Sequence, residues 1–560
     1  MNAMGQRPTL PNLSRKRKRP SSAAFCYRYL TLALLYTAQA FGQLPVAIQV
    51  DAGQRQRPFK PAWNYFGYDE PNYTYAENGR KLIRELVELS PVPVHIRTHF
   101  LLATGDGAAG LKWGSTNAYT EDSSGKPLYD WTIVDKILGT YVDAGAIPFV
   151  EIGFMPKALS TQPEPYTPVW KPGEKNPDYY IGWTYPPNNY EKWGELIYQW
   201  VTHCIAKHGK SEVEKWDWEV WNEPNIGYWH GTPEEYNKLY DFAAAGVKRA
   251  LPSARVGGPA TTGPANEKAA AFLRQFLQHC ASNKNVPLDF ISFHAKGRPT
   301  IVDGHVRMGL AQELRDFSQG VAIVRSFHQF QDLPIVVSEA DPEGCAACSA
   351  RVYPPNAYRN GALYASYEAA AMKAILEVAE RGQANLQGIL TWAFEFEDQP
   401  FFDGFRTLAT NGIDKPVLNF FRMAGQMAGD LLKVESSAAA VDALATRSDR
   451  KMDVLVWNYN DDELGGQDAA VTLWIAGMPP GATRVALRHY RIDADHSNSY
   501  MAWKEMGSPQ KPSPEQYREL EAAGQLQLLG PPGWLNSKEG VAELKFTLPR
   551  QGLSLVELSW

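Results

Sequence analysis

Two glutamates in this 560-residue chain stand where an apolar run gives way to a loop. Glu223 lies in Trp221-Asn-Glu-Pro224, at the end of one such run, and Glu339 ends the run 334–339. Two facing carboxyl groups can cleave a glycosidic bond, because one protonates the leaving oxygen while the other attacks carbon 1 of the sugar. Either glutamate alone would more simply cap a helix or pair with an arginine. Their matching contexts predict a retaining catalytic pair, with Glu223 as acid/base and Glu339 as nucleophile.

Four other residues at the ends of apolar runs are candidate substrate contacts. Asn222 is expected to reach the sugar 2-hydroxyl, and His294 is expected to orient Glu339. His99 is expected to hold outer hydroxyls, and Trp392 to form the floor of the sugar site. A single His or Trp is more often part of a protein core, so these assignments depend on the strand-end positions.

The elements that must position these residues alternate between apolar runs and helical patterns. Near-continuous apolar runs between helices indicate parallel strands that are buried on both faces. About eight such units over roughly 380 residues predict a (β/α)8 barrel, with its chemistry at the carboxyl ends of the strands. The expected strands end at runs 95–99, 147–153, 218–221, 254–258, 289–294, 335–339 and 388–392, and the helical patterns cover 234–251, 268–280, 310–330 and 359–381.

The pattern changes at about Leu432 to short runs that alternate apolar and polar residues. This alternation, with turns rich in Pro and Gly, predicts a β-sandwich over residues 432–560 that follows a catalytic domain over 43–431. No Ser/Gly linker separates the two, so a packed appendage is expected. One helix is expected after Ser513, with Gln516 completing a capping box and Gly524 past its end. The expected strands are 452–458, 470–474, 485–490, 542–546 and 553–558.

The first 42 residues have the pattern of a cleaved secretory signal. A basic run, Arg15 to Arg19, precedes a short apolar stretch and the small-residue site Ala38-Gln-Ala40. An uncleaved membrane anchor is the alternative, but the stretch is short and interrupted by polar residues. The pattern predicts a secreted or periplasmic protein that has no membrane association after cleavage.

Composition narrows the ligand classes. Aromatic residues make up 12% of the chain, and rings of this kind stack on the apolar faces of sugars, although most of them simply fill a large core. Residues 1–40 carry seven Lys or Arg and no acidic residue, so the rest of the chain is more acidic than the overall formal charge of −5. An acidic surface argues against nucleic acid as a partner. No cofactor or metal site is expected, and a homo-oligomer is possible.

Cys345-Ala-Ala-Cys348 has three interpretations: a local disulfide, a metal or redox site, and two free thiols. The pattern lacks the second Cys pair or His pair of a zinc site, so a disulfide formed in an oxidising compartment is favoured.

At these motifs the chain resembles glycoside hydrolase family 39, which contains β-xylosidases and α-L-iduronidase. The resemblance implies a retaining mechanism with Glu223 and Glu339 in the roles given above, and a β-sandwich beside the barrel. It extends from about Tyr65 onward and rests on Arg97-Thr-His-Phe-Leu-Leu102, Pro148-Phe-Val-Glu-Ile-Gly-Phe-Met-Pro156, Trp221-Asn-Glu-Pro224, Gly257-Gly-Pro259, Ile291-Ser-Phe-His294, Glu339-Ala-Asp-Pro342 and Lys415-Pro416.

Within that family the motifs point to two substrates. The stretch 149–159 resembles the xylosidases, whereas the stretches around Lys296 and Arg406 resemble iduronidase, in which the matching Lys and Arg recognise the substrate carboxylate. Such a cationic pair would favour a uronic acid, but Lys296 could instead pair with Glu339, and Arg406 could brace its loop. Glu397, in an acidic loop, could bind sugar hydroxyls or neutralise the same cations. A β-xylosidase-like activity is the first expectation and a uronidase the alternative.

Two further hypotheses come from other classes. A non-catalytic carbohydrate-binding protein on the same fold would be expected to have lost a glutamate of the pair, and both are present. A thiol-disulfide protein would need a compact thioredoxin-like context around Cys345, which the chain lacks. The segment from Tyr166 to Tyr190, rich in Pro, Trp and Tyr, is a plausible lid or subsite wall, or a packed surface loop.

Overall fold

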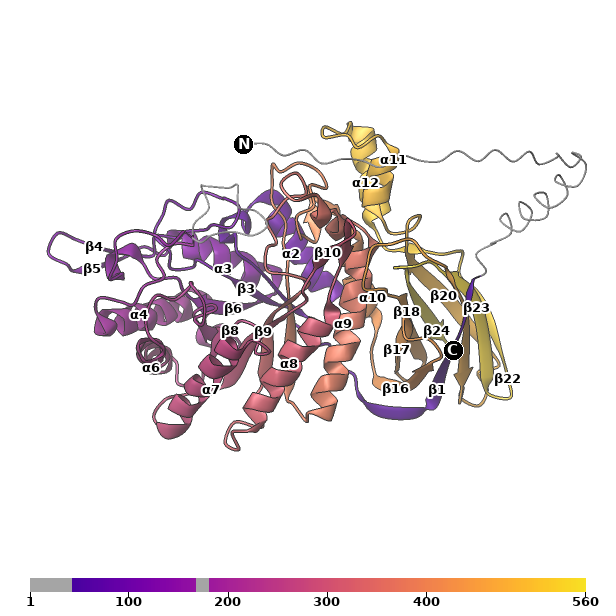
Figure 1. Cartoon of the computed structure of the whole chain (residues 1–560), viewed down its shortest axis with the longest axis horizontal. Coiled ribbons are helices and arrows are strands. Elements are labelled where there is room, and N and C mark those ends of the chain that lie inside the picture. The colour runs from indigo at the N-terminus through magenta and orange to yellow at the C-terminus, as the bar shows by residue number, and fades with distance from the viewer. Residues whose placement is uncertain (1–42, 168–180) are drawn as a thin grey trace, which may run out of the picture. The chain divides into compact units, whose positions relative to one another are not determined.

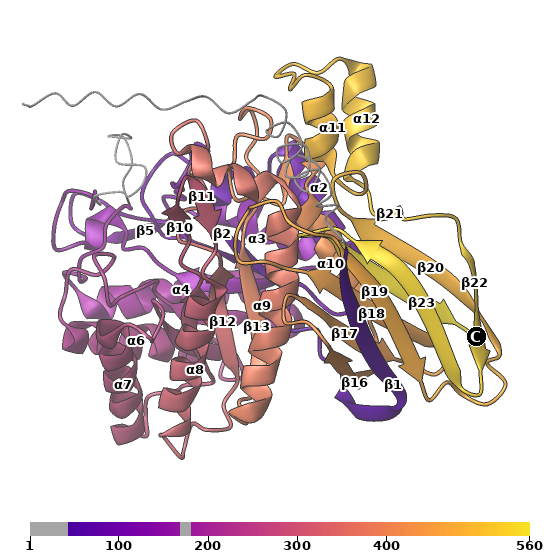
Figure 2. The same ribbon diagram turned by 45° about the vertical axis from the view of Figure 1, so that its right-hand side comes forward.

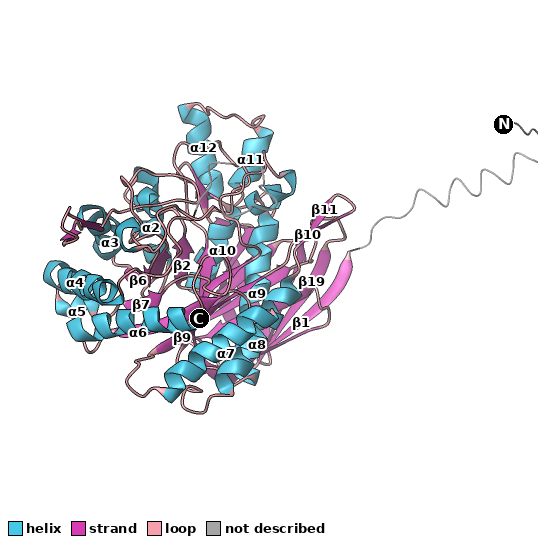
Figure 3. Ribbon diagram, turned by 60° about the vertical axis from the view of Figure 1, so that its left-hand side comes forward, coloured by secondary structure: helices cyan, strands magenta, loops and turns pink. Residues whose placement is uncertain are grey.

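Eight parallel strands close into a barrel in the computed structural model, which describes residues 43–167 and 181–560 (Figure 1). The strands follow one another around the barrel in chain order, and each is followed by at least one helix. Figure 3 shows the helices around the strands. The strands are β2 (Tyr65–Tyr68), β3 (His95–Thr98), β6 (Ile147–Ile152), β7 (Asp217–Val220), β8 (Arg255–Thr261), β9 (Phe290–Lys296), β12 (Ile335–Asp341) and β13 (Leu386–Trp392), and the helices are α2 (Glu77–Leu89), α3 (Thr132–Ala144), α4 (Tyr190–His208), α5 (Lys210–Val213), α6 (Pro233–Ala250), α7 (Glu267–Ser282), α8 (Leu310–Arg325), α9 (Ala362–Arg381) and α10 (Pro416–Gln426).

The predicted barrel is therefore confirmed, with one strand that the apolar runs did not reveal. β2 has only four residues, and all four are buried. It pairs with β13 on one side and with β3 on the other, so it closes the ring. A run this short carries too little alternation to be recognised without its neighbours.

Shorter elements lie in the loops that join the barrel strands to the helices. The hairpin of β10 and β11 follows β9, and the 3-10 helix η3 follows β12, so both lie in loops beyond the carboxyl ends of barrel strands. These elements are η1 (Pro71–Tyr73), β4 (Tyr119–Glu121), β5 (Pro127–Tyr129), η2 (Lys157–Leu159), β10 (Thr300–Val302), β11 (His305–Arg307), η3 (Pro354–Asn360), β14 (Ala409–Thr410) and β15 (Ile413–Asp414).

A second sheet makes up the predicted β-sandwich. Its strands lie in the order β21-β20-β22-β23-β19-β1-β16-β17-β18-β24, and a further pairing of β20 with β24 joins the two sides of the sheet. The alternating apolar residues of these strands form a separate core inside it. The strands are β1 (Leu44–Pro58), β16 (Asp430–Ser436), β17 (Val441–Arg447), β18 (Lys451–Asn458), β19 (Ala469–Ala476), β20 (Arg484–Ile492), β21 (Gln527–Leu528), β22 (Gly533–Lys538), β23 (Val541–Leu548) and β24 (Leu553–Ser559).

The expected boundary at residue 43 is wrong, because β1 belongs to the sandwich and not to the barrel. It pairs antiparallel with β16, with Val50 opposite Val434. Figures 1 and 2 show this indigo strand among the late strands of the chain. Val46, Ile48 and Val50 are buried in the sandwich core. The pairing joins residues almost 400 positions apart, so no local pattern could indicate it.

The sandwich packs against the barrel, as the absence of a linker predicted. Asp461, after β18, accepts hydrogen bonds from the backbone of Gly309 and Leu310 at the start of α8. The predicted helix is α12 (Pro514–Gly524), with the capping box of Ser513 and Gln516, and it lies beside α11 (Ser499–Glu505), which was not expected (Figure 2). Their side chains pack against Phe402 in the loop after β13. Residues of the sandwich region therefore pack against a loop at the carboxyl ends of the barrel strands.

Within the described residues, no helix is long and apolar enough to cross a membrane. The predicted signal, residues 1–42, and residues 168–180 of the Tyr166 to Tyr190 segment lie outside the described residues.

Candidate active site

The backbone after β7 is held in an unusual conformation at the predicted acid/base. Trp221 and Glu223 have φ angles of 73° and 46°, a region that residues other than glycine rarely adopt. Hydrogen bonds hold this segment on both sides, from Trp221 N to Ile152 O at 3.1 Å and from Glu223 N to Ala260 O at 2.9 Å. The neighbouring strands therefore fix the direction of the Glu223 side chain.

Glu339 lies on β12 directly beside β9, with His294 as its register partner. The register of this strand pair shifts between Val337 and Glu339. On β9, His294 and Lys296 are two residues apart and point to the same side of the strand. Both side chains therefore reach Glu339.

The two predicted catalytic carboxyl groups face each other. One oxygen of Glu223, one oxygen of Glu339 and one ring nitrogen of His294 all lie within 4.8 Å of one another. A pair this close matches the separation of about 5–5.5 Å in retaining enzymes, whereas inverting enzymes need about 6.5–9.5 Å to admit a water.

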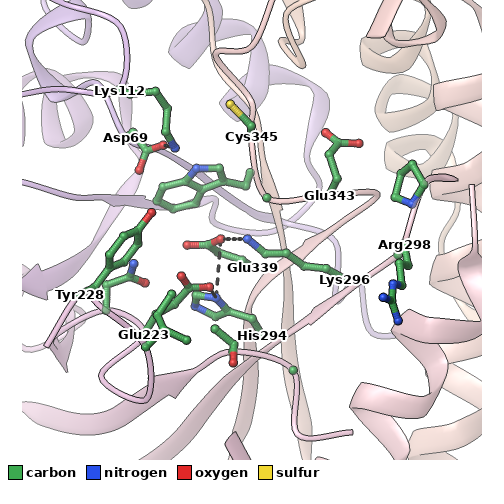
Figure 4. A pocket seen from close by; sticks show the side chains of 18 of the residues that line it. Asp69, Lys112, Glu223, Tyr228, His294, Lys296, Arg298, Glu339, Glu343 and Cys345 are labelled. Atoms are coloured by element: carbon green, nitrogen blue, oxygen red, sulfur yellow. Dashed lines mark hydrogen bonds and ion pairs between the residues drawn. The ribbon is translucent and has the colours of Figure 1, made fainter. Parts of the chain in front are cut away.

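These groups lie in a pocket of about 700 Å³ at the carboxyl ends of the barrel strands (Figure 4). Glu223 is 9% exposed and Glu339 is 3% exposed, so both are largely removed from solvent but open to the pocket. The lining residues are Asp69, His99, Lys112, Asn222, Glu223, Ile226, Tyr228, Thr262, Gly263, His294, Lys296, Gly297, Arg298, Pro299, Glu339, Glu343, Gly344, Cys345, Tyr353, Asn356, Tyr358, Arg359 and Trp392.

Arg97 on β3 is fully buried next to the pocket and forms hydrogen bonds with several residues of the site. Its guanidinium donates to Glu219 Oε2 at 2.5 Å, to Asn222 Oδ1 at 3.0 Å and to Glu339 Oε1 at 3.3 Å. Arg97 donates a hydrogen bond to the amide oxygen of Asn222. The amide nitrogen of Asn222 has no hydrogen-bond partner among the described residues and can act as a donor. This arrangement suits the predicted contact with a sugar hydroxyl.

Positive charges keep Glu339 ionised. Burial alone would raise its pKa, but the charges of His294, Lys296 and His99 outweigh burial and hold the pKa well below its usual range. Lys296 forms an ion pair with Glu339. Burial opposes the charge of Lys296, yet the carboxylates of Glu339 and Glu223 raise its pKa. Glu339 therefore has the protonation state that a nucleophile requires.

A second charged group forms another wall of the pocket. His99 Nδ1 lies 2.7 Å from Asp69 Oδ1, and its Nε2 lies 3.0 Å from Glu151 Oε2. Although burial opposes protonation, Glu151 and Asp69 raise the pKa of His99 well above its usual value. Lys112 forms a further ion pair with Asp69. His99 is thus a cation held by carboxylates, and it lines the pocket as predicted.

Trp392 also lies where it was expected. Its buried ring lies 4.4 Å from the His99 ring, centroid to centroid, and the Arg97 guanidinium lies 5.2 Å from its centroid. Gly67 on β2 makes room for this indole, because a Cβ at Gly67 would lie 2.5 Å from the Trp392 ring. The indole is among the groups that line the pocket.

Three expectations need correction. Arg406 is 0% exposed and does not line the pocket, because Asp341 and Glu343 hold it as an ion pair within the protein. Glu397 does not line the pocket either, since its carboxylate accepts a hydrogen bond from Asn78 N at the start of α2, where a helix favours negative charge.

The third correction concerns His294. Its Nδ1 lies 3.0 Å from Glu223 Oε1 and 3.6 Å from Glu339 Oε2. The imidazole therefore contacts Glu223 more closely than Glu339, the residue that it was expected to orient.

Cys345 and Cys348 form a disulfide, which confirms the favoured interpretation. Cys345 lines the pocket in the loop that follows β12, the strand of Glu339. The Cys348 carbonyl accepts hydrogen bonds from Asn356 Nδ2 and Arg359 Nη1, both at 2.9 Å. The disulfide thus belongs to the wall of the pocket.

Several residues of the site were not among the predicted site residues. Asp69 and Lys112 come from the loops after β2 and β3. Asp and Lys are common in loops, so their residue types alone do not indicate a site. Arg97, Glu151 and Glu219 carried a better signal, because charged residues inside apolar strands must find partners. These charged residues lie on different strands, so their network could be recognised only once the order of the strands around the barrel was known.

The closed (β/α)8 barrel, with two glutamates facing each other, one beyond the end of β7 and one on β12, identifies this chain as a glycoside hydrolase. A family model for glycosyl hydrolases family 39 matches residues 46–534, and the chain belongs to this family.

Similar proteins include members of this family with two different activities. The chain is 28% identical over 469 residues to a β-xylosidase of Geobacillus stearothermophilus, covering 80% of this chain and 85% of that protein. It is 25% identical over 542 residues to the α-L-iduronidase of Mus musculus, covering 87% of this chain and 77% of that protein. The crystal structure of the GH39 enzyme from Xanthomonas axonopodis pv. citri has the same fold, with a TM-score of 0.74 at 22% identity over 94% of this chain and 99% of that one.

Proposed function

We propose that this glycoside hydrolase removes a terminal sugar from an oligosaccharide by a retaining double displacement, and that its substrate is a β-xyloside. The observation that carries the mechanism is the proximity of the Glu223 and Glu339 carboxyl oxygens, within 4.8 Å, across one pocket. In the first step Glu223 protonates the glycosidic oxygen while Glu339 attacks carbon 1, which forms a glycosyl ester. In the second step Glu223 accepts a proton from water, and this water displaces Glu339.

The surrounding residues support the charges of these steps. Lys296 and Arg97 contact the Glu339 carboxylate and stabilise the anion before it attacks. Asn222, held by Arg97, is placed to donate to the sugar 2-hydroxyl, whose hydrogen bond strengthens in the transition state. His294 contacts Glu223 and restricts its position.

The preference for a neutral sugar rests on the positions of the cations. Arg406, one of the two cations expected to bind a substrate carboxylate, is buried and paired inside the protein. Lys296, the other one, is paired with Glu339. The similarity to β-xylosidases extends over most of the chain. A pentoside, which has no charged group at carbon 5, fits these pairings.

A uronidase is the second candidate, and one observation favours it. Arg298 lines the pocket beyond Lys296, is exposed, and forms no ion pair within the described part of the chain (Figure 4). A substrate carboxylate would have this guanidinium available for a charge-assisted hydrogen bond. The similarity to α-L-iduronidases agrees with this candidate. No observation favours the non-catalytic carbohydrate-binding protein, because both glutamates are present and face each other.

Hydrolysis of aryl β-xyloside, α-L-iduronide and β-glucuronide by the wild type and Glu339→Ala tests the proposal. The β-xyloside should have the highest kcat/KM, and the variant should be inactive. Azide should restore turnover to Glu339→Gly and yield a glycosyl azide of inverted configuration. A preference for a uronide would favour the second candidate, and cleavage of no glycoside, or an unimpaired Glu339→Ala, would refute the assignment.

We also propose that the protein is exported. The support is the basic and apolar pattern of residues 1–42 and the disulfide between Cys345 and Cys348, which forms in oxidising compartments. N-terminal sequencing of the protein recovered from the producing cells should find a start near residue 41, and a start at Met1 would contradict the proposal.

A further inference from the structure

The outer face of the sandwich carries a groove that is separate from the catalytic pocket. Its volume is about 370 Å³. Three neighbouring strands, β19, β1 and β16, supply most of its lining. We call it the Trp474 groove, and its lining residues are Gln49, Val50, Asp51, Gln54, Lys433, Glu435, Trp474 and Ala476.

Strand alternation turns the polar side chains of the Trp474 groove outward. On β19, Leu473 and Ile475 are buried in the sandwich core, whereas Trp474 between them is 40% exposed. On β1, Val50 is buried between Gln49 and Asp51. The indole therefore lies on the solvent face of a sheet whose opposite face is packed.

The polar residues are placed by cross-strand pairing. Gln49 lies opposite Glu435 and Asp51 lies opposite Lys433, so amide and charged groups form a row next to the strand of Trp474. The register then shifts between Asp51 and Arg55, and this irregularity contains Gln54. The Asp51 carboxylate accepts a hydrogen bond from Gly53 N at 2.9 Å, which stabilises the turn of the chain there. The groove thus rests on regular sheet and ends at a bulge.

This combination of groups matches a sugar ring. An indole face packs against the apolar C–H face of a pyranose, while amides and carboxylates beside it can exchange hydrogen bonds with the hydroxyl groups. A protein partner is a poorer match, because the cores of protein interfaces are depleted of charged residues. Here charged and amide side chains border the indole on one side.

The charges of the groove favour a neutral ligand. Lys433 Nζ lies 2.7 Å from Glu435 Oε1, so these two charges compensate each other. Asp51 has no such partner among the ion pairs of the described residues, which leaves the groove with an excess of negative charge. A uronate or a sulfated sugar would be repelled.

We propose that the Trp474 groove binds a neutral glycan chain. It shares no residue with the catalytic pocket, so it would hold the enzyme on a glycan near its oligosaccharide substrates without contributing to bond cleavage. The choice of a glycan as ligand rests on the membership of the chain in a glycoside hydrolase family, and does not depend on which sugar the catalytic pocket takes.

Retardation in native gels that contain soluble neutral xylan tests this proposal. The protein would be Glu339→Ala, so that the polymer is not degraded, with and without Trp474→Ala. The added substitution should weaken retardation at least tenfold, and Gln49→Ala should weaken it to a smaller degree. In the catalytically intact chain, Trp474→Ala should leave the hydrolysis of aryl glycosides unchanged.

Trp534→Ala is the matched control. Trp534 lies on β22 and is 60% exposed, but it is outside the Trp474 groove, and Arg484 stacks 4.5 Å from its ring centroid. This variant should be retarded like its parent. A charge control uses gels with polygalacturonate, which should retard the protein less than neutral xylan does.

Equal retardation of the parent and Trp474→Ala would overturn the proposal, and so would no retardation of the parent or stronger retardation by polygalacturonate. If Trp474→Ala were poorly folded, as judged by thermal unfolding, the Gln49→Ala result would decide. Failure of the proposed catalytic function is a separate outcome, because it appears as absent aryl glycoside turnover while the gel result still tests the groove.

Discussion

The ammonium of Lys296 pairs with the carboxylate of Glu339, the predicted nucleophile. Of the two roles left open for this cation, recognition of an acidic substrate and pairing with Glu339, the structure shows the second. This pairing lowers the pKa of Glu339, together with His294 and His99. Lys296 therefore helps to keep the Glu339 carboxyl group ionised.

Substitution of Lys296 by Met should lower kcat/KM for all cleaved glycosides by about 100-fold, because a preorganised charge next to the nucleophile is lost. The pKa of Glu339 should rise without this cation. The acid limb of the kcat/KM profile, along which Glu339 must be ionised, should therefore move to higher pH. Lys296→Arg retains the charge and should retain the position of the limb. A loss confined to uronides would instead assign Lys296 to the substrate.

Substitution of Arg406 by Met should destabilise the fold by about 3–5 kcal/mol, because the buried Asp341 would lose its ion-pair partner, although Glu343 would keep its ion pair with Arg359. Arg351→Ala is a matched control on a nearby loop, since Arg351 is largely exposed where it pairs with Asp403, and its loss should cost at most about 1 kcal/mol. Urea unfolding measures both effects. A variant of Arg406 that is as stable as the wild type but selectively inactive on uronides would contradict the structural role.

The buried carboxyl group of Glu395 should make the protein less stable at alkaline pH. Burial raises its pKa to about 8, so the folded state keeps a proton that the unfolded state loses above about pH 4.5. The stabilisation is complete below the unfolded pKa and is lost as the pH rises towards 8. Glu395→Gln should therefore flatten the decline in unfolding free energy between pH 5 and 8 by up to about 1.4 kcal/mol per pH unit. Parallel curves for the two proteins would contradict this prediction.

Removal of the disulfide with Cys345→Ser and Cys348→Ser should mainly raise KM. The disulfide closes a loop of four residues, which corresponds to about 2 kcal/mol of chain entropy. The loop forms a wall of the pocket, whereas Glu339 lies on β12 and keeps its position. Wild-type protein treated with a reductant should behave like the double variant. Unchanged KM in both would show that the hydrogen bonds to the Cys348 carbonyl hold this wall without the disulfide.

The predicted site was most accurate where a residue follows a recognisable strand. Glu223, Asn222, His99, His294 and Trp392 all line the pocket, because the carboxyl ends of parallel strands meet at one end of a barrel. Assignment to the substrate site failed for Glu397 and Arg406, which lie in the long loop after β13, whereas the alternative that Arg406 braces its loop agrees with its ion pairs. Loop geometry depends on distant contacts, such as the packing of α11 and α12 against Phe402.

The amino-acid sequence by itself determined the barrel, most of the sandwich strands and the two glutamates that face each other in the pocket. These features follow from local periodicity and from residue types at strand ends, which neighbouring residues encode. Only the tertiary structure decided that β1 pairs with β16, that Lys296 binds Glu339 and that Arg406 is buried. Each of these pairings joins residues far apart in the chain, and a charged side chain takes whichever opposite charge the fold brings within reach.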